Sequence, residues 1–394
     1  MSELLESRWQ ETKSALLEGL NGTKKSVMAS TLENTRKYLA ESAGTGATSA
    51  GNIATLNRVI LPVIRRVMPT VIANELVGVQ PMTGPVGQIH TLRVRYSETT
   101  NDASAGNTDT TAGEEALSPF KIAEAYSGDL ATAKAANTAA KEGTAGRKMS
   151  IQIMKQTVEA KSRKLSARWT FEAAQDAQSM HGIDVEAEII AALAQEITAE
   201  IDQEVLQSLV TLSGTAAQTY DQAAVSGTAT FVGDEHAALA VQINRVSNLI
   251  AQRTRRGAGN WAVVSPFALT ILQSATTSAF ARTTEGTFEA PTNTKMVGTL
   301  NSAMKIYVNT YAADNAAVLV GYKGTSESDA AAFYCPYIPL MSSGVVLDPT
   351  SFEPVVSFMT RYGYVELSNS ASSLGNAADY LGNVAITSGN VTFS

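Results

Sequence analysis

The sequence is poor in the residues that build disulfides, metal centres and nucleophilic sites. It contains one cysteine, Cys335, and three widely spaced histidines, His90, His181 and His236. A single cysteine excludes an intrachain disulfide framework and fits a reducing compartment, and no Cys/His spacing typical of zinc occurs. Cys335 lies among apolar residues, so we expect a buried thiol and no nucleophile. We predict neither a metal nor a cofactor.

Signatures of common enzymes and of membrane proteins are also missing. The chain has no Walker phosphate loop, no glycine-rich dinucleotide fingerprint and no G-x-S-x-G elbow. It has no apolar run of the ~18 residues that a membrane helix needs. The N-terminus, MSELLESRWQ, lacks the regions of a secretory signal. We therefore expect no catalytic residue and no association with a membrane.

Size and charge narrow the class of protein further. At 394 residues, 44% of them hydrophobic, the chain can bury a large core and form two or more lobes. The formal net charge of −7 argues against tight, sequence-independent binding of nucleic acid, which needs clustered Lys and Arg. A surface of this charge can lie near a polyanion without adhering to it.

One stretch, Leu76–Tyr96, predicts a long arm that leaves the body of the protein. Its sequence, LVGVQPMTGPVGQIHTLRVRY, places a Pro/Gly cluster between a short apolar run and an alternating segment. From Gln88 the alternation predicts a strand that begins half-buried and becomes basic and exposed. Residues 99–148 follow and are polar and low in complexity, so we expect an extended loop that cannot form a core alone.

A basic segment is followed by a long acidic helix. From Trp169 to Asn244 there is no Lys or Arg, and Asp184 to about Leu212 predicts a helix that Asp184 caps and Gly214 ends. Apolar residues at every fourth position form its buried stripe, and it would be roughly 40 Å long. The basic residues before it are Arg147, Lys148, Lys155, Lys161, Arg163, Lys164 and Arg168.

Opposite charges on these two elements suggest an intersubunit contact. A strand that has swung outward cannot easily lie along its own helix, so we predict that the basic segment contacts the acidic helix of a neighbouring copy. Exposed ion pairs are individually worth about 0–1 kcal/mol, so this contact would set register more than strength. The alternative is that both faces are independently solvated. The acidic residues proposed for the contact are Glu186, Glu188, Glu196, Glu200 and Glu204.

The remainder of the chain predicts an α+β lobe. We expect a helix over His236–Arg253, a buried strand over Trp261–Val264 and a helix start at Ser265-Pro266. Residues 365–394 are expected to complete a sheet edge. The short strands expected between these regions are Lys305–Val308, Ala317–Gly321, Ala332–Tyr334, Val345–Leu347 and Val355–Tyr364.

Four blocks, in this order, resemble the major capsid proteins of tailed phages of the T-even type. They are Ile151–Asp176, His181–Gly214, Trp261–Phe267 and Phe333–Tyr364. The resemblance implies an α+β, HK-97-like capsid fold with an N-terminal arm, an extended loop, a peripheral domain with a long spine helix, and an axial domain. The implied boundaries are 1–41 for an N-terminal assembly segment, 42–87 for the arm, 88–176 for the loop and its flanks with insert 99–148, 177–256 for the peripheral domain with spine helix 184–212, 257–348 for the axial domain, and 349–394 for the return to the peripheral domain and the C-terminal strands.

The resemblance also implies that the N-terminal segment is removed during assembly. Relatives lose such a segment to a phage protease that resembles one preferring Leu/Ile-x-Glu before a small residue. This tripeptide occurs at Leu4–Glu6, Leu16–Glu18, Leu39–Glu41 and Ile122–Glu124, and the third abuts a Gly/Ser/Ala-rich linker. We predict cleavage between Glu41 and Ser42.

The implied function is structural. Many copies would form hexamers and pentamers that close into an icosahedral head around double-stranded DNA, bound without sequence specificity. Implied partners are a scaffold and prohead protease, a portal, and vertex or decoration proteins, with assembly in the host cytoplasm and a final location in the virion. Two alternatives remain at this point: an encapsulin-like cellular compartment shell, and a soluble α+β enzyme.

Overall fold

The computed structural model describes most of the chain from residue 72 onward and forms two compact units. Unit 1 comprises Met1–Gly87, Thr157–Gln207 and Phe333–Val365, and unit 2 comprises Gln88–Gln156, Ser208–Ala332 and Glu366–Ser394. The described residues are 9, 13–14, 17, 25–26, 28–34, 72–100, 110–116, 126–129, 134–181, 184–222, 232–275, 280–282, 295–327, 329–351, 353–368 and 376–387.

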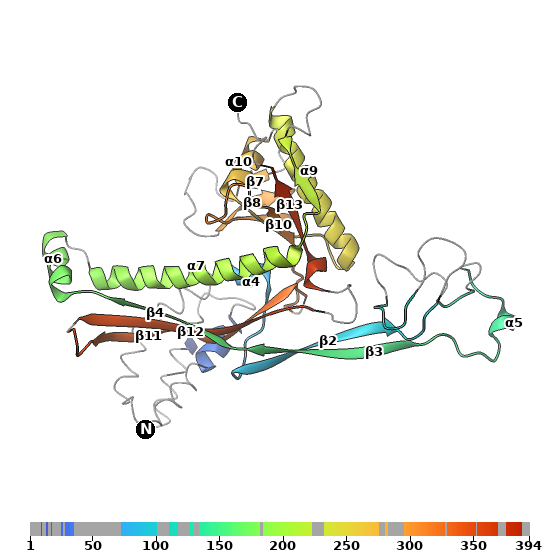
Figure 1. Ribbon diagram of the computed structural model, residues 1–394, viewed down its shortest axis with the longest axis horizontal. Helices are drawn as coiled ribbons and strands as arrows, with labels where there is room; N and C mark the ends of the chain where they lie inside the picture. The colour runs from blue at the N-terminus through green and yellow to red at the C-terminus, as the bar shows by residue number, and fades with distance from the viewer. Residues whose placement is uncertain are drawn as a thin grey trace. The chain divides into compact units, whose positions relative to one another are not determined.

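Unit 1 is built on a four-stranded sheet and a long helix. The strand order is β1 (Gly78–Val79), β11 (Ala332–Leu347), β12 (Pro354–Glu366) and β4 (Lys161–Arg168). Strand β12 runs antiparallel to β4, and β1 runs parallel to β11. The helix α7 (Val185–Ser213) extends along this sheet (Figure 1). Two shorter helices, α4 (Ala73–Leu76) and α6 (Phe171–His181), also belong to this unit.

Helix α7 confirms the prediction made from its spacing and caps. The N–H groups of Glu186 and Ala187 donate to the Asp184 carboxylate at 3.1 and 3.4 Å. Gly214 ends the helix with φ of +66°, a value that favours glycine. The predicted apolar stripe of α7 is buried from Leu193 onward, while its first two residues, Val185 and Ile189, are only half-buried.

Strand β11 corrects two expectations. Ala332–Leu347 is one strand of 16 residues, not two short strands, and it belongs to the sheet of unit 1 instead of the lobe that follows residue 257. Proline at position 336 is tolerated because β1 pairs with only the start of β11, and the Pro336 carbonyl still accepts the N–H of Met82 at 3.0 Å. Cys335 is buried in this strand, as predicted, and burial raises the pKa of its thiol to about 12.

Strands β2 (Val86–Tyr96) and β3 (Met149–Glu159) form a two-stranded hairpin, whose insert includes the short helix α5 (Thr138–Lys141). The predicted exposure of β2 was wrong, because the strand begins exposed and becomes buried at Arg93 and Arg95. Arg93 pairs with Glu115 at 2.8 Å, and Tyr96 packs on Tyr126 with ring centroids 4.5 Å apart. The polar insert thus supplies the partners that cover the end of this strand.

Unit 2 contains a seven-stranded sheet. Its order is β5 (Gln218–Tyr220), β13 (Leu381–Ile386), β10 (Val318–Gly321), β6 (Trp261–Val264), β9 (Met304–Val308), β8 (Lys295–Leu300) and β7 (Phe280–Arg282). A 3-10 turn, η2 (Ala377–Tyr380), precedes β13. Strand β13 lies between β5 and β10, so the expectation that the C-terminal strands complete an edge was wrong. The reason is that β5, which follows α7 directly, takes the edge by pairing parallel to β13.

Helices α9 (Val232–Thr254) and α10 (Pro266–Ser274) pack with this sheet. The predicted inward residues of α9, Leu239, Ile243, Val246 and Ile250, are all fully buried. Ser265 caps α10 by accepting the N–H of Ala268 at 3.2 Å, as predicted. Because α9 belongs to unit 2 while most of α7 belongs to unit 1, the structure separates two helices that the sequence reading placed in one domain.

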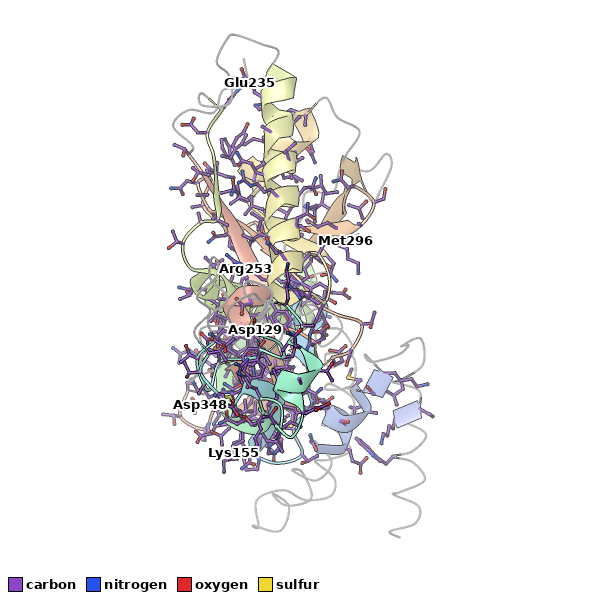
Figure 2. The ribbon with its side chains drawn as sticks, turned by 90° about the vertical axis from the view of Figure 1, so that its right-hand side faces the viewer. Asp129, Lys155, Glu235, Arg253, Met296 and Asp348 are labelled. Atoms are coloured by element: carbon purple, nitrogen blue, oxygen red, sulfur yellow. The ribbon has the colours of Figure 1, made fainter. Side chains whose placement is uncertain are left out.

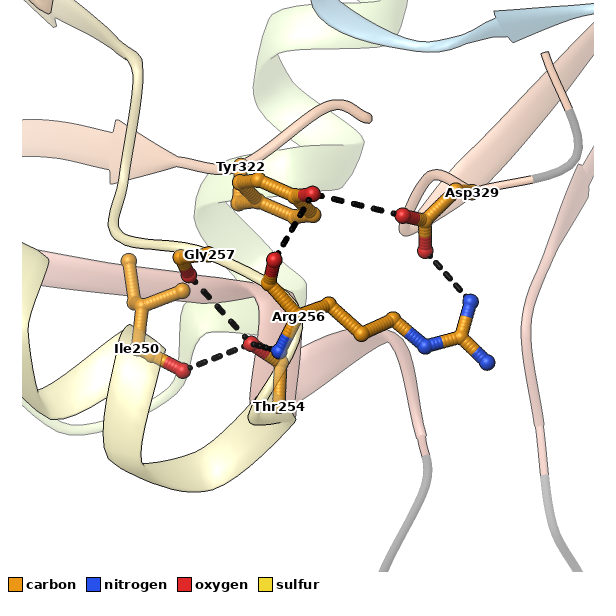
Figure 3. A network of polar contacts seen from close by, with 6 residues as sticks. All are labelled: Ile250, Thr254, Arg256, Gly257, Tyr322 and Asp329. Atoms are coloured by element: carbon orange, nitrogen blue, oxygen red, sulfur yellow. Dashed lines mark hydrogen bonds and ion pairs between the residues drawn. The ribbon is translucent and has the colours of Figure 1, made fainter. Parts of the chain in front are cut away.

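The end of α9 is fixed by a network of polar contacts (Figure 3). Arg256 Nη1 pairs with Asp329 at 2.6 Å, and Tyr322 Oη lies 3.4 Å from both the Arg256 carbonyl and the Asp329 carboxylate. Glu235 and Arg253 lie toward opposite ends of the helix (Figure 2), where their charges complement its dipole. Arg256, two residues after α9, therefore ties the end of this helix to the loop containing Asp329.

Candidate assembly site

Five of the seven predicted basic residues lie on two different strands, β3 and β4. Arg147 and Lys148 precede β3, where Arg147 Nη1 donates to the Tyr126 carbonyl at 3.0 Å, and Lys155 is exposed on β3 itself (Figure 2). On β4 the exposure alternates, as expected for a strand with two different faces. Lys164 and Arg168 are exposed on one face, while Arg163 is half-buried on the other. Lys161 shares the face of Arg163 but is exposed.

Arg163 joins β4, β12 and α7 through one guanidinium group. Its Nη1 and Nη2 atoms lie 2.5 Å from carboxylate oxygens of Glu200 and Glu204, which are one helical turn apart. Its Nε donates to Tyr362 Oη at 2.6 Å, and the Tyr362 hydroxyl also bonds to Glu204. A planar fork of five N–H donors suits this threefold contact.

This geometry corrects the premise of the intersubunit hypothesis. Strand β4 does lie beside its own long helix, because it pairs antiparallel with β12, whose Tyr362 reaches Glu204. Arg163, Glu200 and Glu204 therefore meet within one subunit. Contacts of Lys155, Lys161, Lys164, Arg168, Glu186, Glu188 and Glu196 with a neighbouring copy stay predictions, as do those of Arg147 and Lys148.

The cluster shifts the titration of its members in the directions that an ion pair requires. Burial acts to lower the pKa of Arg163, but hydrogen bonds with Glu204 and Tyr362 more than offset it and raise the pKa. Burial likewise acts to raise the pKa of Glu204, yet the bonds from Tyr362 and Arg163 lower it. The pKa of Tyr362 is raised by burial and by the Glu204 carboxylate. All three groups keep their usual charge at neutral pH.

Asp202 is a buried acid that the sequence reading did not single out. Its side chain is 3% exposed, and its carboxylate accepts the N–H of Ile72 at 2.9 Å. Burial raises its pKa to about 7, although the Ile72 hydrogen bond acts in the opposite direction. The signal was present in the sequence, since Ala194, Thr198 and Leu206 repeat at four-residue spacing through position 202 and are buried as well.

One face of the β2–β3 hairpin is apolar and exposed. Leu92 on β2 and Ile151 and Ile153 on β3 are each 68% exposed. Arg95 contacts Met154 at 3.5 Å, so these two share the opposite face, and strand alternation places Leu92, Ile151 and Ile153 together. A two-stranded ribbon with such a face does not bury its own apolar surface.

Three further features concern the proposed cleavage site, metal ligands and membrane-spanning helices. Glu41 and Ser42 lie outside the described residues. Among the residues that the structure describes, no three His, Cys, Asp or Glu side chains gather as metal ligands. Within the same part of the chain, no helix has the length and apolarity needed to cross a membrane.

Comparison with known proteins identifies the family of this chain. A family model described as the major capsid protein Gp23 matches residues 53–386. The chain belongs to this family. The family's major capsid proteins from Vibrio phage KVP40 and Enterobacteria phage T4 are each 29% identical to it, over 83% of this chain and over 80% and 78% of their own lengths. That of Serratia phage KSP90 is 28% identical over 92% of this chain and 90% of its own.

Membership in the Gp23 family makes this chain a shell protein of a phage head, located in the capsid of the virion. Its α+β architecture is that of a tailed-phage capsid protein. Among solved structures, the capsid of Myoviridae phage XM1 aligns with 80% of this chain and 92% of that chain, at a TM-score of 0.45 and 9% identity. The relatives named above are all phage capsid proteins, so neither the encapsulin-like compartment nor the soluble enzyme is favoured.

Proposed function

We propose that the subunits of this shell are held together in part by the apolar face of the β2–β3 hairpin, which docks on a neighbouring copy. The observation that carries the proposal is the exposure of Leu92, Ile151 and Ile153 on one face of a ribbon that has no core of its own. Burying such side chains at a subunit contact removes them from water and contributes about 1.5–3 kcal/mol for each one fully buried. Hexamers and pentamers built this way close into an icosahedral head.

The charged residues then fix the register of the contact. Lys155 on the hairpin and Lys164 and Arg168 on β4 are exposed, as are Glu186 and Glu188 in the first turn of α7. Opposite charges at a rim steer association and disfavour wrong registers, while they add little affinity. The energy of docking therefore resides in the apolar face and its specificity in the charges.

We also propose the finer events of assembly, which the resemblance to this family suggests. A scaffold directs assembly in the host cytoplasm, the prohead protease cuts between Glu41 and Ser42, and a portal with vertex or decoration proteins completes the head. The packaged DNA is enclosed without sequence-specific binding, and the net charge of −7 disfavours tight adhesion of the shell to its phosphates. Intact-mass measurement on mature particles tests the cut: a subunit that begins at Ser42 supports it, and one that retains residues 1–41 contradicts it.

Substitution of the apolar face tests the docking proposal. We expect Ile151→Thr with Ile153→Thr to reduce the yield of closed particles while leaving the subunit folded, since both side chains are exposed in the single chain. Gln152→Ser on the same strand is the matched control, because residue 152 lies on the opposite face of the ribbon. Electron microscopy and light scattering measure assembly, and calorimetry measures folding. Normal particles from the double variant would contradict the proposal.

A further inference from the structure

The described part of the N-terminal segment packs into unit 1. Asn34 is buried, and its Nδ2 donates two hydrogen bonds, to the Met82 carbonyl at 2.6 Å and to the Tyr337 carbonyl at 3.0 Å. Met28, Thr31 and Leu32 are buried beside it. Residues 28–34 are thus held on their own subunit by a specific polar contact as well as by apolar packing.

Asn34 makes its two hydrogen bonds where the backbone pairing between residues 78–82 and β11 ends. The N–H groups of Gln80 and Met82 donate to the carbonyls of Tyr334 and Pro336, each at 3.0 Å, and so extend the short β1 pairing. The Asn34 carboxamide takes the next acceptors, the Met82 and Tyr337 carbonyls. A carboxamide with two N–H donors therefore closes the end of this ladder.

Met82 belongs to the corner from which the hairpin starts, close to Gly87 on β2 and to Gly363, which itself lies against Val158 on β3. A Cβ at Gly87, near the start of β2, would lie 3.5 Å from Met82 Cε. A Cβ at Gly363 on β12 would lie 2.9 Å from Val158 on β3 and 3.3 Å from Met82 Sδ. Ala160, next to β3, donates its N–H to the Pro85 carbonyl at 2.9 Å. The hydrogen bond from Asn34 to the Met82 carbonyl therefore acts at the base of both strands.

We propose that Asn34 is a positioning residue for the base of the β2–β3 hairpin, the part that belongs to unit 1, and that residues 28–34 hold this base in one arrangement until the N-terminal segment is removed. Removal takes the donor away from two backbone carbonyls, and buried acceptors without a donor are costly, so the base rearranges or accepts new donors. The timing of this release rests on the proposed cut after Glu41, whereas the role of Asn34 is testable in the intact chain.

Amide hydrogen exchange on the full-length chain tests the positioning role of Asn34. We expect Asn34→Ala to increase exchange at the Gln80 and Met82 amides by about tenfold, the effect of losing roughly one hydrogen bond. Asn34→Asp, which keeps the shape but does not donate, should have at least this effect, and Asn34→Gln should restore part of the protection. Ser30→Ala is the control, because Ser30 donates to the Ser26 carbonyl within its own helix.

A shortened chain that begins at Ser42 provides the second part of the experiment. We expect the same loss of protection at Gln80 and Met82, with amides of α9 in unit 2 unchanged. Unchanged protection at Gln80 and Met82 in either Asn34→Ala or the shortened chain would overturn the proposal, and so would an equal loss throughout α9, because that would indicate general destabilisation. If exchange responds as expected but mature particles retain residues 1–41, Asn34 keeps its positioning role and the proposed cut fails.

Discussion

The Asp202 carboxylate accepts the backbone N–H of Ile72 at 2.9 Å, deep within unit 1. Ile72 in turn begins the helical turn of α4 that leads to β1, since its carbonyl accepts the N–H groups of Glu75 and Leu76. An acid in the middle of the long helix therefore fixes the start of α4. Because the side chain is 3% exposed, its charged form is maintained there at a cost in free energy.

Asp202 should make the folded subunit more stable in mild acid. Its pKa is raised from 3.8 to about 7 on folding, so the folded chain binds this proton more tightly than the unfolded chain does. The resulting stability is present in full below pH ~4 and is lost as the pH rises through about 7, by at most ~4 kcal/mol. We expect the wild-type free energy of unfolding to rise from pH 8 to pH 5 by more than that of Asp202→Asn. Parallel pH profiles for the two proteins would contradict this assignment.

Arg163 should stabilise the single subunit and not an interface between subunits. We expect Arg163→Ala to lower the free energy of unfolding by about 1–2 kcal/mol, because three partners share its guanidinium but each exposed pair is worth little. Lys164→Ala, one residue along β4 on its other face, should change stability by less than about 0.5 kcal/mol. Denaturant unfolding of the unassembled chain measures both. Equal effects of the two substitutions would show that the cluster contributes nothing specific.

Charge reversal at exposed lysines should act on assembly. Lys155→Glu combined with Lys164→Glu is expected to slow particle formation and weaken its dependence on salt, because rim charges mainly set association rates and register. The melting temperature of the unassembled chain should stay unchanged. Light scattering at two ionic strengths follows the rate, and assembly at the wild-type rate in both would argue for the alternative, two independently solvated faces.

Gly321 should not tolerate a side chain. It lies on β10 opposite Trp261 of β6, and a Cβ there would stand 2.1 Å from the buried indole ring. We expect Gly321→Ala to cost about 1–3 kcal/mol through overpacking of the core of unit 2. Gly146→Ala, where an added Cβ meets no atom within 4 Å, serves as the matched control. Thermal unfolding compares them, and identical melting temperatures would refute the packing argument.

Local signals sufficed for the two long helices α7 and α9. Helix α7 follows from its apolar spacing with a capping Asp184 and a terminal Gly214, and α9 follows from four inward residues at helical spacing. These features act within a few residues of one another, so the sequence shows them directly. The family resemblance predicted the function. Composition and the missing catalytic motifs only reduced the number of possible protein classes.

Features that depend on distant partners were missed. The burial of Arg93 depends on Glu115 in the polar insert, and the pairing of Arg163 depends on helix residues about 40 positions away. The place of β13 inside its sheet depends on β5, far earlier in the chain. Strand β11 continues through Pro336 because β1 is short. No local pattern encodes such tertiary contacts.

A three-dimensional reconstruction of the assembled shell would show where the hairpin docks. We expect Leu92, Ile151 and Ile153 of each hairpin to be buried against a neighbouring subunit, with Arg163, Glu200 and Glu204 still paired within their own chain. A shell in which the three apolar side chains face solvent in every subunit would contradict this expectation.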